Sequence, residues 1–227
     1  MLRPLLHLFF PALCIHCGQP LVGSERHLCT HCLTEIPWTH HAAHPDNTAE
    51  MRLAGRIPTE ASAALMTFRK GNVAQSIVHQ IKYHGSTQLA SQFGHLLGKE
   101  ILASGRFNDI DLIVPVPLHW WRQLRRGYNQ SRLICEAVSE TIGKPVSSGN
   151  LYRKKYTTSQ THKNRLNRLN NMQGVFAVKK PQYFEDKHIL LIDDILTTGA
   201  TTEACYLAMS TIPGLRISVA ALVITGQ

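Results

Sequence analysis

The chain has 227 residues, enough for one good-sized domain and a small appendage. Apolar residues make up 44% of it, an ordinary value for a globular protein with a real core. No hydrophobic run approaches the ~20 residues that a membrane-spanning helix needs, so the sequence excludes such a span. The formal net charge of +9 favours anionic partners: phosphorylated metabolites, nucleic acid or an acidic protein.

The first eleven residues have to be considered as a signal peptide. Their apolar core is short, is broken by His7 and is bounded by prolines, and no small-residue cleavage site follows. The residues before Cys14 outline a lipoprotein cleavage box, but bulky Leu13 stands where a small residue is needed. We therefore expect this segment to pack against the rest of the protein, and we expect a cytoplasmic protein.

Four of the six cysteines form two Cys-x-x-Cys pairs, at Cys14, Cys17, Cys29 and Cys32. Two such pairs separated by a short polar loop can place four thiolates around one tetrahedral zinc ion. Gly18 follows the second thiol, as a tight turn favours. A site closed by four thiolates has no open position, so we predict that the zinc is structural and supplies folding energy to a small N-terminal ribbon.

Other readings of these cysteines remain open. They could form two disulfides or act as redox thiols, although a cytosolic chain argues against structural disulfides. His16, His27 and His31 lie near the thiols and could replace one of them as a ligand. Cys135 and Cys205 fall within helical patterns and read as small buried hydrophobic residues.

The polar stretch after the ribbon contains His40, His41 and His44 without ordered spacing, so we read it as a linker. The expected organisation is a zinc ribbon over residues 1–40, a linker over 41–60 and one domain over 61–227. Within that domain the pattern alternates between strands and helices, which predicts an α/β fold with a doubly wound, mostly parallel sheet. The expected strands are 61–68, 111–117, 174–178, 188–194 and 217–224, and the expected helices are 72–83, 88–103, 129–142 and 201–211.

The strand over 111–117 ends in a proline-rich turn, Pro115, Val116, Pro117 and Leu118. Such a turn at the carboxyl end of a strand can direct amides outward, which suits a pyrophosphate, although Pro-x-Pro strand ends are common. Three basic residues follow, Arg122, Arg125 and Arg126, which add positive charge near the turn or form a solvated face.

The stretch over residues 152–168 is dense in Lys, Arg, Ser, Thr, Asn and Gln, and it cannot bury itself. It is either a disordered surface loop or a flexible hood that closes over a ligand and excludes water. Arg165 and Arg168 are three residues apart, so on a helix they would share a face and could clamp phosphate or nucleic acid.

Residues 189–201 carry the strongest chemical signal. Four aliphatic residues lead into Asp193 and Asp194, and a turn follows that consists of Thr197, Thr198, Gly199, Ala200 and Thr201. The apolar run predicts a strand buried on both faces, with the acids at the edge where open α/β sheets bind ligands. A turn rich in hydroxyl groups at a helix N-terminus is a phosphate cradle. Taken separately, acids and turn could equally be a solvated strand end and a helix cap.

In this order, however, the acids and the turn resemble the phosphoribosyl-pyrophosphate (PRPP) motif of type I phosphoribosyltransferases. The resemblance implies that Asp193 and Asp194 contact the ribose hydroxyls, that residues 197–201 hold the 5′-phosphate, and that PRPP binds with Mg²⁺. It also implies that residues 115–118 bind the pyrophosphate and that 152–168 is the family's hood. Lys82 is a further candidate phosphate contact; a solvated lysine at a helix end is the alternative.

The order of motifs along the chain is similar to one branch, the ComF/GntX family of zinc-ribbon phosphoribosyltransferase-like proteins. This resemblance rests on the cysteine pairs and on residues 81–85, 114–117, 125–130, 158–160 and 193–199. Members are associated with bacterial competence, in which single-stranded DNA enters the cytoplasm.

Three hypotheses follow from the sequence. The chain is an active phosphoribosyltransferase with an unnamed acceptor, or a DNA-uptake accessory that uses the fold to bind single-stranded DNA, or an adaptor whose ribbon docks a competence helicase or another DNA-processing protein. The candidate DNA contacts are the arginines at 122, 125, 126, 165 and 168, and aromatic residues among them could stack on bases.

Overall fold

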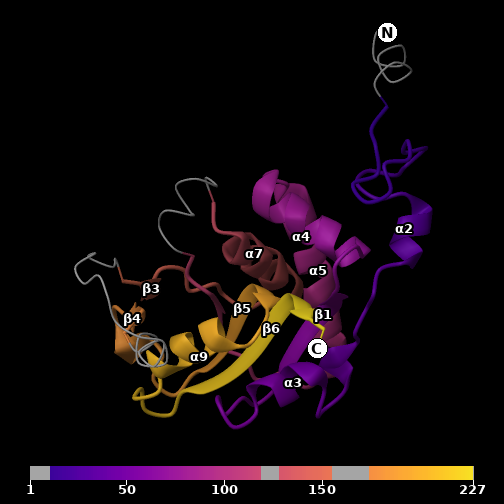
Figure 1. The fold of residues 1–227 in the computed structure, drawn as a ribbon. Helices are drawn as coiled ribbons and strands as arrows, with labels where there is room; N and C mark the ends of the chain where they lie inside the picture. Colours follow the sequence, from indigo (N-terminus) through magenta and orange to yellow (C-terminus); the bar gives the residue numbers. More distant parts are fainter. Residues whose placement is uncertain (1–10, 119–127, 155–173, 227) are drawn as a thin grey trace, which may run out of the picture.

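The computed structural model describes residues 11–118, 128–154 and 174–226 (Figure 1). The N-terminal part contains α2 (Thr30–Thr34), η1 (His41–Ala43) and α3 (Thr48–Leu53). The elements that follow are β1 (Ser62–Phe68), α4 (Val73–Tyr83), α5 (Thr87–Ser104), β2 (Leu112–Pro115), α7 (Gln130–Ile142), β3 (Leu151–Arg153), β4 (Phe176–Val178), η2 (Pro181–Tyr183), β5 (His188–Leu196), α9 (Ala200–Leu207) and β6 (Arg216–Thr225).

Four strands form a parallel sheet in the order β1-β6-β5-β2. The two central strands, β6 and β5, are buried over most of their length, which explains their near-continuous apolar sequences. The register sets Leu112 of β2 opposite Ile189 of β5, and Asp193 of β5 opposite Ala221 of β6. The acid-bearing end of β5 therefore lies between the carboxyl ends of its two neighbours.

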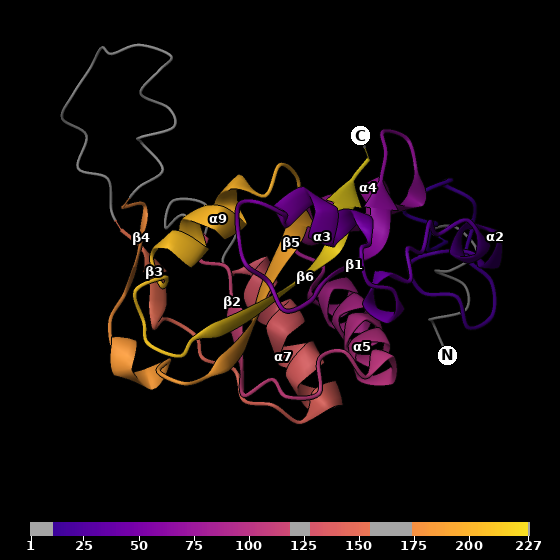
Figure 2. The same cartoon turned by 90° about the horizontal axis from the view of Figure 1, so that it is seen from below.

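Helices cover both faces of this sheet (Figure 2). Alternate strand residues, such as Leu190 and Leu222, face a cluster that includes the apolar sides of α4, α5 and α7. Their neighbours, such as Leu191 and Val219, face a second cluster that contains α3 and α9. The predicted doubly wound parallel α/β fold is thus confirmed, and the strands and helices expected in the domain are present with shifted ends.

The carboxyl edge of the sheet has a topological switch point. The chain leaves β2 towards α7 on one face, and it leaves β5 towards α9 on the other. Because the two connections diverge, the carboxyl ends of β2 and β5 border a crevice, which is where open α/β sheets bind their ligands. Beside this edge, β3 and β4 form a small antiparallel sheet of their own.

The stretch over 41–60, which we expected to be a linker, instead folds onto the sheet. The Asn47 side chain caps α3 by accepting hydrogen bonds from the amides of Ala49 and Glu50. Its amide group donates to the carbonyl of Ser62 at 2.8 Å, which ties the cap to β1. Ala49 and Leu53 are completely buried. This segment is therefore part of the α/β core, because its apolar side faces the sheet.

The N-terminal unit also packs onto the domain. Residues 37–39 run beside β1, where the amide of Thr39 donates to Leu65 and the amide of Thr67 donates to Pro37. Trp38 stacks on Phe93 of α5 with ring centroids 6.3 Å apart. The backbone hydrogen bonds between residues 37–39 and β1 cover the free edge of this strand. The boundary at residue 40 stays a prediction.

Among the described helices, not one is both long enough and apolar enough to cross a membrane.

Candidate functional site

A cavity of about 240 Å³ opens at the switch point of the sheet. It brings together parts of the chain that are far apart in sequence. Its lining consists of Lys82, residues 116–118, Ser131, Arg153, residues 193–195, Thr197 and Thr201. The acid pair, the proline-rich turn, part of the threonine turn and Lys82 were all predicted as site residues, and the fold places them around one space. Ser131 was not predicted, and Arg153 was expected only as part of the hood over 152–168.

Asp193 is half-buried at the end of β5. Its Oδ1 atom accepts a hydrogen bond from the Ser131 hydroxyl at 3.3 Å and from the amide of Asp194 at 2.8 Å. Burial and the neighbouring Asp194 carboxylate raise the pKa of Asp193 to about 7, although these hydrogen bonds and Lys82 oppose the shift. Asp193 therefore gains or loses its proton near neutral pH.

Asp194 forms an ion pair with Lys82, whose Nζ lies 3.0 Å from its Oδ1. The side chains are only 14% and 18% exposed, respectively, so water screens this pair less than a surface pair. Lys82 comes from the last turn of α4, a helix capped at its start by Asn72 and buried along one side. The lysine is thus an integral part of the site, and the reading as a solvated helix-end residue does not hold.

The threonine turn joins β5 to α9. Gly199 has a φ of +79° and is the N-cap of α9, and the first turn of this helix contains Thr201, which lines the same cavity as the two acids. A Cβ at this glycine would lie 2.8 Å from Leu53 Cδ2 of α3. Thr197 and Thr201 line the cavity. Residues 198–200 form the turn between them without lining it.

Two arginines that sequence reasoning missed hold the outer side of this turn. Arg52 Nη1 donates to the carbonyls of Leu196 at 3.3 Å and Thr197 at 2.8 Å, and to the Thr225 hydroxyl at 2.9 Å. Arg56 Nη1 donates to the Thr198 carbonyl, and its Nη2 pairs with Glu203 of α9. The segment expected to be a linker therefore supports the predicted phosphate cradle from behind.

The proline-rich turn stands between two cavities. The amide of Val116 donates to the carbonyl of Ile192 at 2.9 Å, which continues the pairing of β2 with β5. Pro117 and Leu118 line the 240 Å³ cavity and also a second one of about 320 Å³, and Pro115 lines only the second. Arg153 of β3 lines both, with its guanidinium 5.5 Å from the centre of the Phe176 ring.

Five of the basic candidates lie outside the described residues: Arg122, Arg125, Arg126, Arg165 and Arg168. Most of the expected hood over 152–168 lies outside them as well. Their proposed contacts with phosphate or DNA stay predictions.

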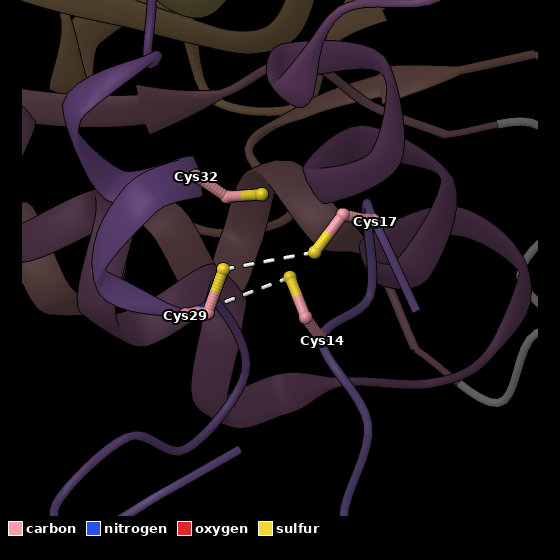
Figure 3. A group of neighbouring side chains, drawn as sticks. All are labelled: Cys14, Cys17, Cys29 and Cys32. Atoms are coloured by element: carbon pink, nitrogen blue, oxygen red, sulfur yellow. Dashed lines mark hydrogen bonds between the residues drawn. The ribbon is translucent and has the colours of Figure 1, made fainter. Parts of the chain in front are cut away.

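The four N-terminal cysteines converge at one point (Figure 3). Their sulfur atoms all lie within 4.8 Å of one another, and the Sγ atoms of Cys17 and Cys29 are 3.6 Å apart. All six cysteines of the chain are free thiols, so the disulfide reading is not supported. His16 is hydrogen-bonded to Ser76 of α4, at 3.0 Å, and it is not among the clustered ligand atoms.

The chemistry of these thiols fits a bound cation. Burial raises the pKa of Cys14, but backbone hydrogen bonds from Cys17, Cys29 and His16 outweigh it and lower the pKa to about 6. Burial and the other thiols raise the pKa of Cys32. A metal ion at the centre would offset this repulsion and favour four thiolates. The cluster can therefore hold a metal ion, whereas Cys135 and Cys205 are fully buried single thiols.

Fold and site together define a class: a doubly wound α/β protein with a crevice lined by two acids and a threonine-rich turn, and with a cysteine-rich N-terminal unit. No family model matches the chain. It is 30% identical over 194 residues to the DNA utilization protein YhgH of Escherichia coli strain K12, covering 83% of this chain and 74% of that protein. It is 27% identical to Competence protein F of Haemophilus influenzae, covering 85% and 88%.

A third relative, Competence protein ComFC of Bacillus subtilis, is 25% identical and covers 83% of this chain and 73% of its own length. The chain belongs to the ComF family. Among solved structures, glutamine PRPP amidotransferase from B. subtilis aligns with a TM-score of 0.42 at 15% identity, over 59% of this chain and 26% of that one.

Proposed function

We propose that this protein binds Mg²⁺-PRPP in the 240 Å³ cavity and uses it in the uptake or processing of single-stranded DNA during natural transformation. The observation that carries the proposal is the convergence of four predicted elements on one cavity: the acid pair, the threonine turn, the proline-rich turn and Lys82. The two acids can accept hydrogen bonds from hydroxyl groups, and the elements on either side of them can bind phosphate. A ligand that carries hydroxyl groups between two phosphate groups matches this arrangement.

Each part of the site has a role in this proposal. Asp193 and Asp194 accept hydrogen bonds from the ribose hydroxyls. The amides of the turn over 197–201 and the start of α9 bind the 5′-phosphate, because a helix N-terminus favours negative charge. The pyrophosphate lies towards residues 115–118, within reach of Lys82. The positive charge of the chain raises the local concentration of such an anion.

The acid pair also fits the magnesium ion that accompanies PRPP. Carboxylate oxygens are the ligands that magnesium prefers, and Asp193 and Asp194 supply them at the edge of the cavity. When bound, magnesium neutralises charge on the pyrophosphate. The residues of the chain would do the rest: they orient the ribose and hold carboxylates near C1, where positive charge develops if the bond to pyrophosphate breaks.

The proposed link to DNA rests on the relatives and on charge. Two relatives are named for competence and one for DNA utilization. An excess of nine positive charges suits a polyanion. The candidate contacts are the five arginines of residues 122–126 and 165–168. A zinc ion held by the four cysteines would stabilise the N-terminal unit, which we propose as a surface for docking a DNA-processing protein such as a helicase.

A second candidate function is a binding module that uses PRPP as a ligand without turning it over. The names of the relatives favour it, since they refer to DNA and competence. Release of pyrophosphate separates the two candidates, because only a transferase releases it in the presence of a nucleophilic acceptor.

The proposal is tested by parallel titrations of the intact protein. We expect Mg²⁺-PRPP to bind with a stoichiometry of one, and a labelled single-stranded oligonucleotide to bind with an affinity that falls as salt rises. Replacing Arg122, Arg125 and Arg126 together with glutamine should weaken DNA binding and leave the free protein folded. If neither ligand binds at low salt, the proposed function is wrong.

A further inference from the structure

The turn that we propose as the phosphate cradle is held from behind by two arginines, and this arrangement has a consequence for its amides. Three successive carbonyls, those of Leu196, Thr197 and Thr198, accept hydrogen bonds from Arg52 or Arg56. In a trans peptide the C=O of one residue and the N–H of the next point in opposite directions. The amides of Thr198 and Gly199 therefore point away from the two arginines.

The amides of Thr198 and Gly199 donate no hydrogen bond within the part of the chain that the structure describes. Thr197 and Thr198 are exposed, whereas Gly199 is buried beside Leu53, so the turn is open to solvent at its two threonines. Amides that point to solvent in succession form an anion-binding concavity. The carbonyl contacts of Arg52 and Arg56 thus fix the turn in the orientation that a phosphate needs.

The arginines also place positive charge behind the turn. Arg56 is paired with Glu203, whereas Arg52 donates within the described residues to neutral oxygen atoms, namely two carbonyls and the Thr225 hydroxyl. Its full charge therefore acts on the turn. A cation on the carbonyl side polarises the peptide groups and strengthens their amides as donors to an anion.

The support for both arginines is rigid. Asn47 caps α3, and Glu50 on the same helix pairs with Arg106 at 2.6 Å. Leu53 is completely buried and lies against Gly199, where a Cβ would come within 2.8 Å of Leu53 Cδ2. The helix is thus anchored on two sides, so the guanidinium groups can hold the turn in one conformation instead of following its movement.

We propose that Arg52 and Arg56 are positioning residues that preorganise residues 197–201 for a phosphate group. The inference rests on the proposed function, because it assigns the 5′-phosphate of PRPP to this turn. It goes further in stating that the segment over 48–56, outside the sequence motif, determines the affinity for that phosphate. The arginines act through the turn and do not contact the ligand.

The experiment compares two probes that occupy opposite ends of the site. Ribose 5-phosphate carries the phosphate that binds the turn, and inorganic pyrophosphate carries the group that binds near residues 115–118. Arg52→Met and Arg56→Met should weaken binding of Mg²⁺-PRPP and of ribose 5-phosphate by about 10- to 100-fold, the range found when the residues that orient a metal ligand are lost. Binding of pyrophosphate should stay close to the wild-type value.

Two further variants separate positioning from a general loss of structure. Arg106→Met removes an anchor of the same segment, to Glu50 and the His44 carbonyl, without touching the turn. It should leave the ratio of the two probe affinities unchanged. Arg52→Lys keeps a charged donor and should recover part of the lost affinity.

Amide hydrogen exchange of the ligand-free protein provides a readout that needs no ligand. The amides of Ala200 and Glu203, which donate to the Thr198 hydroxyl and the Gly199 carbonyl, should exchange faster in Arg52→Met than in the wild type, and Arg106→Met should not produce this change. Equal weakening of both probes, or equally fast exchange in Arg106→Met, would overturn the inference. Wild-type binding of PRPP with unchanged affinity in Arg52→Met would overturn it and leave the proposed function intact, whereas a wild type that binds none of the three ligands would overturn both.

Discussion

Lys82 and Asp194 form a partly buried ion pair, with Nζ and Oδ1 3.0 Å apart. The pair connects the end of α4 to the end of β5 and places one cation beside two adjacent carboxylates. In the free protein this cation offsets part of the repulsion between Asp193 and Asp194. In the proposed complex the same lysine lies within reach of the pyrophosphate, so one side chain serves both states.

The first prediction concerns Lys82→Met. We expect it to weaken Mg²⁺-PRPP binding and to lower the free energy of unfolding by about 1.5–3 kcal/mol at pH 8, since a hydrogen bond between charged groups is lost. The loss should shrink at pH 5, where the acid pair can take up a proton. Chemical denaturation at both pH values measures it. Lys82→Arg is the control and should stay near the wild type; an equal loss at pH 5 and pH 8 would contradict the account.

The second prediction is a pH dependence of stability that comes from Asp193. Its pKa is raised in the folded state from 3.8 to about 7, so the folded protein binds this proton more tightly than the unfolded chain does. The stability that the protonated Asp193 carboxyl contributes is fully present below pH 3.8 and is lost as the pH rises through about 7.

Denaturation curves at pH 6 and pH 8 should therefore show a larger stability decrease in the wild type than in Asp193→Asn, which cannot titrate. Binding of Mg²⁺-PRPP should show the opposite trend and become tighter over the same range, because the ribose hydroxyls donate to the ionised carboxylate. Identical pH profiles for the wild type and Asp193→Asn would show that Asp193 does not titrate here.

The third prediction concerns Gly199→Ala. The substitution meets both a φ of +79° and a contact of 2.8 Å with Leu53, so it should cost about 1–3 kcal/mol of stability and weaken PRPP binding. Gly55→Ala is a matched control, since its φ is +73° but nothing lies within 4 Å of the added Cβ. The loss of stability in Gly199→Ala beyond that in Gly55→Ala, measured by thermal unfolding, reports the clash with Leu53 of α3. Adding Leu53→Ala should relieve part of the effect on ligand binding; no relief would mean that the backbone strain alone is responsible.

The fourth prediction is that the protein carries one zinc ion per chain. Cys17→Ser should lose the metal, as measured by elemental analysis, and should lower the melting temperature by several degrees. The effect should extend to the domain, because Cys14, Leu28 and Cys32 share an apolar cluster with α4 and α5. His16→Ala should retain the zinc, because His16 bonds to Ser76. A metal-free wild type with an unchanged melting curve after chelation would rule the site out.

Much of this architecture could be predicted from the sequence because it depends on local pattern. Continuous apolar runs such as residues 189–192 indicate buried parallel strands. Helices buried on one face, such as α4, are recognised by apolar residues that recur every three to four positions. The acid pair, the threonine turn and the cysteine pairs are contiguous motifs, so the sequence shows them directly.

The parts that were missed depend on contacts between distant segments. The short helix α3 has little period of its own, and its burial depends on Ser62 and Gly199. One local signal was available, since Asn47 precedes Glu50 by three residues as in a helix capping box. No local signal pointed to Ser131 or Arg52, because the fold alone brings them to the carboxyl edge of β5, and the composition of 152–168 marked Arg153 only as part of a candidate hood.

The central claim is that the acid pair and the turn beside it form a site for Mg²⁺-PRPP. Isothermal titration calorimetry of Mg²⁺-PRPP against the wild type, Asp193→Asn with Asp194→Asn, and Glu140→Gln as an exposed-acid control tests it most directly. The account predicts saturable binding with a stoichiometry of one for the wild type and the control, and no detectable binding for the double variant in its folded state. Equal binding by all three proteins, or no binding by the wild type, would contradict it.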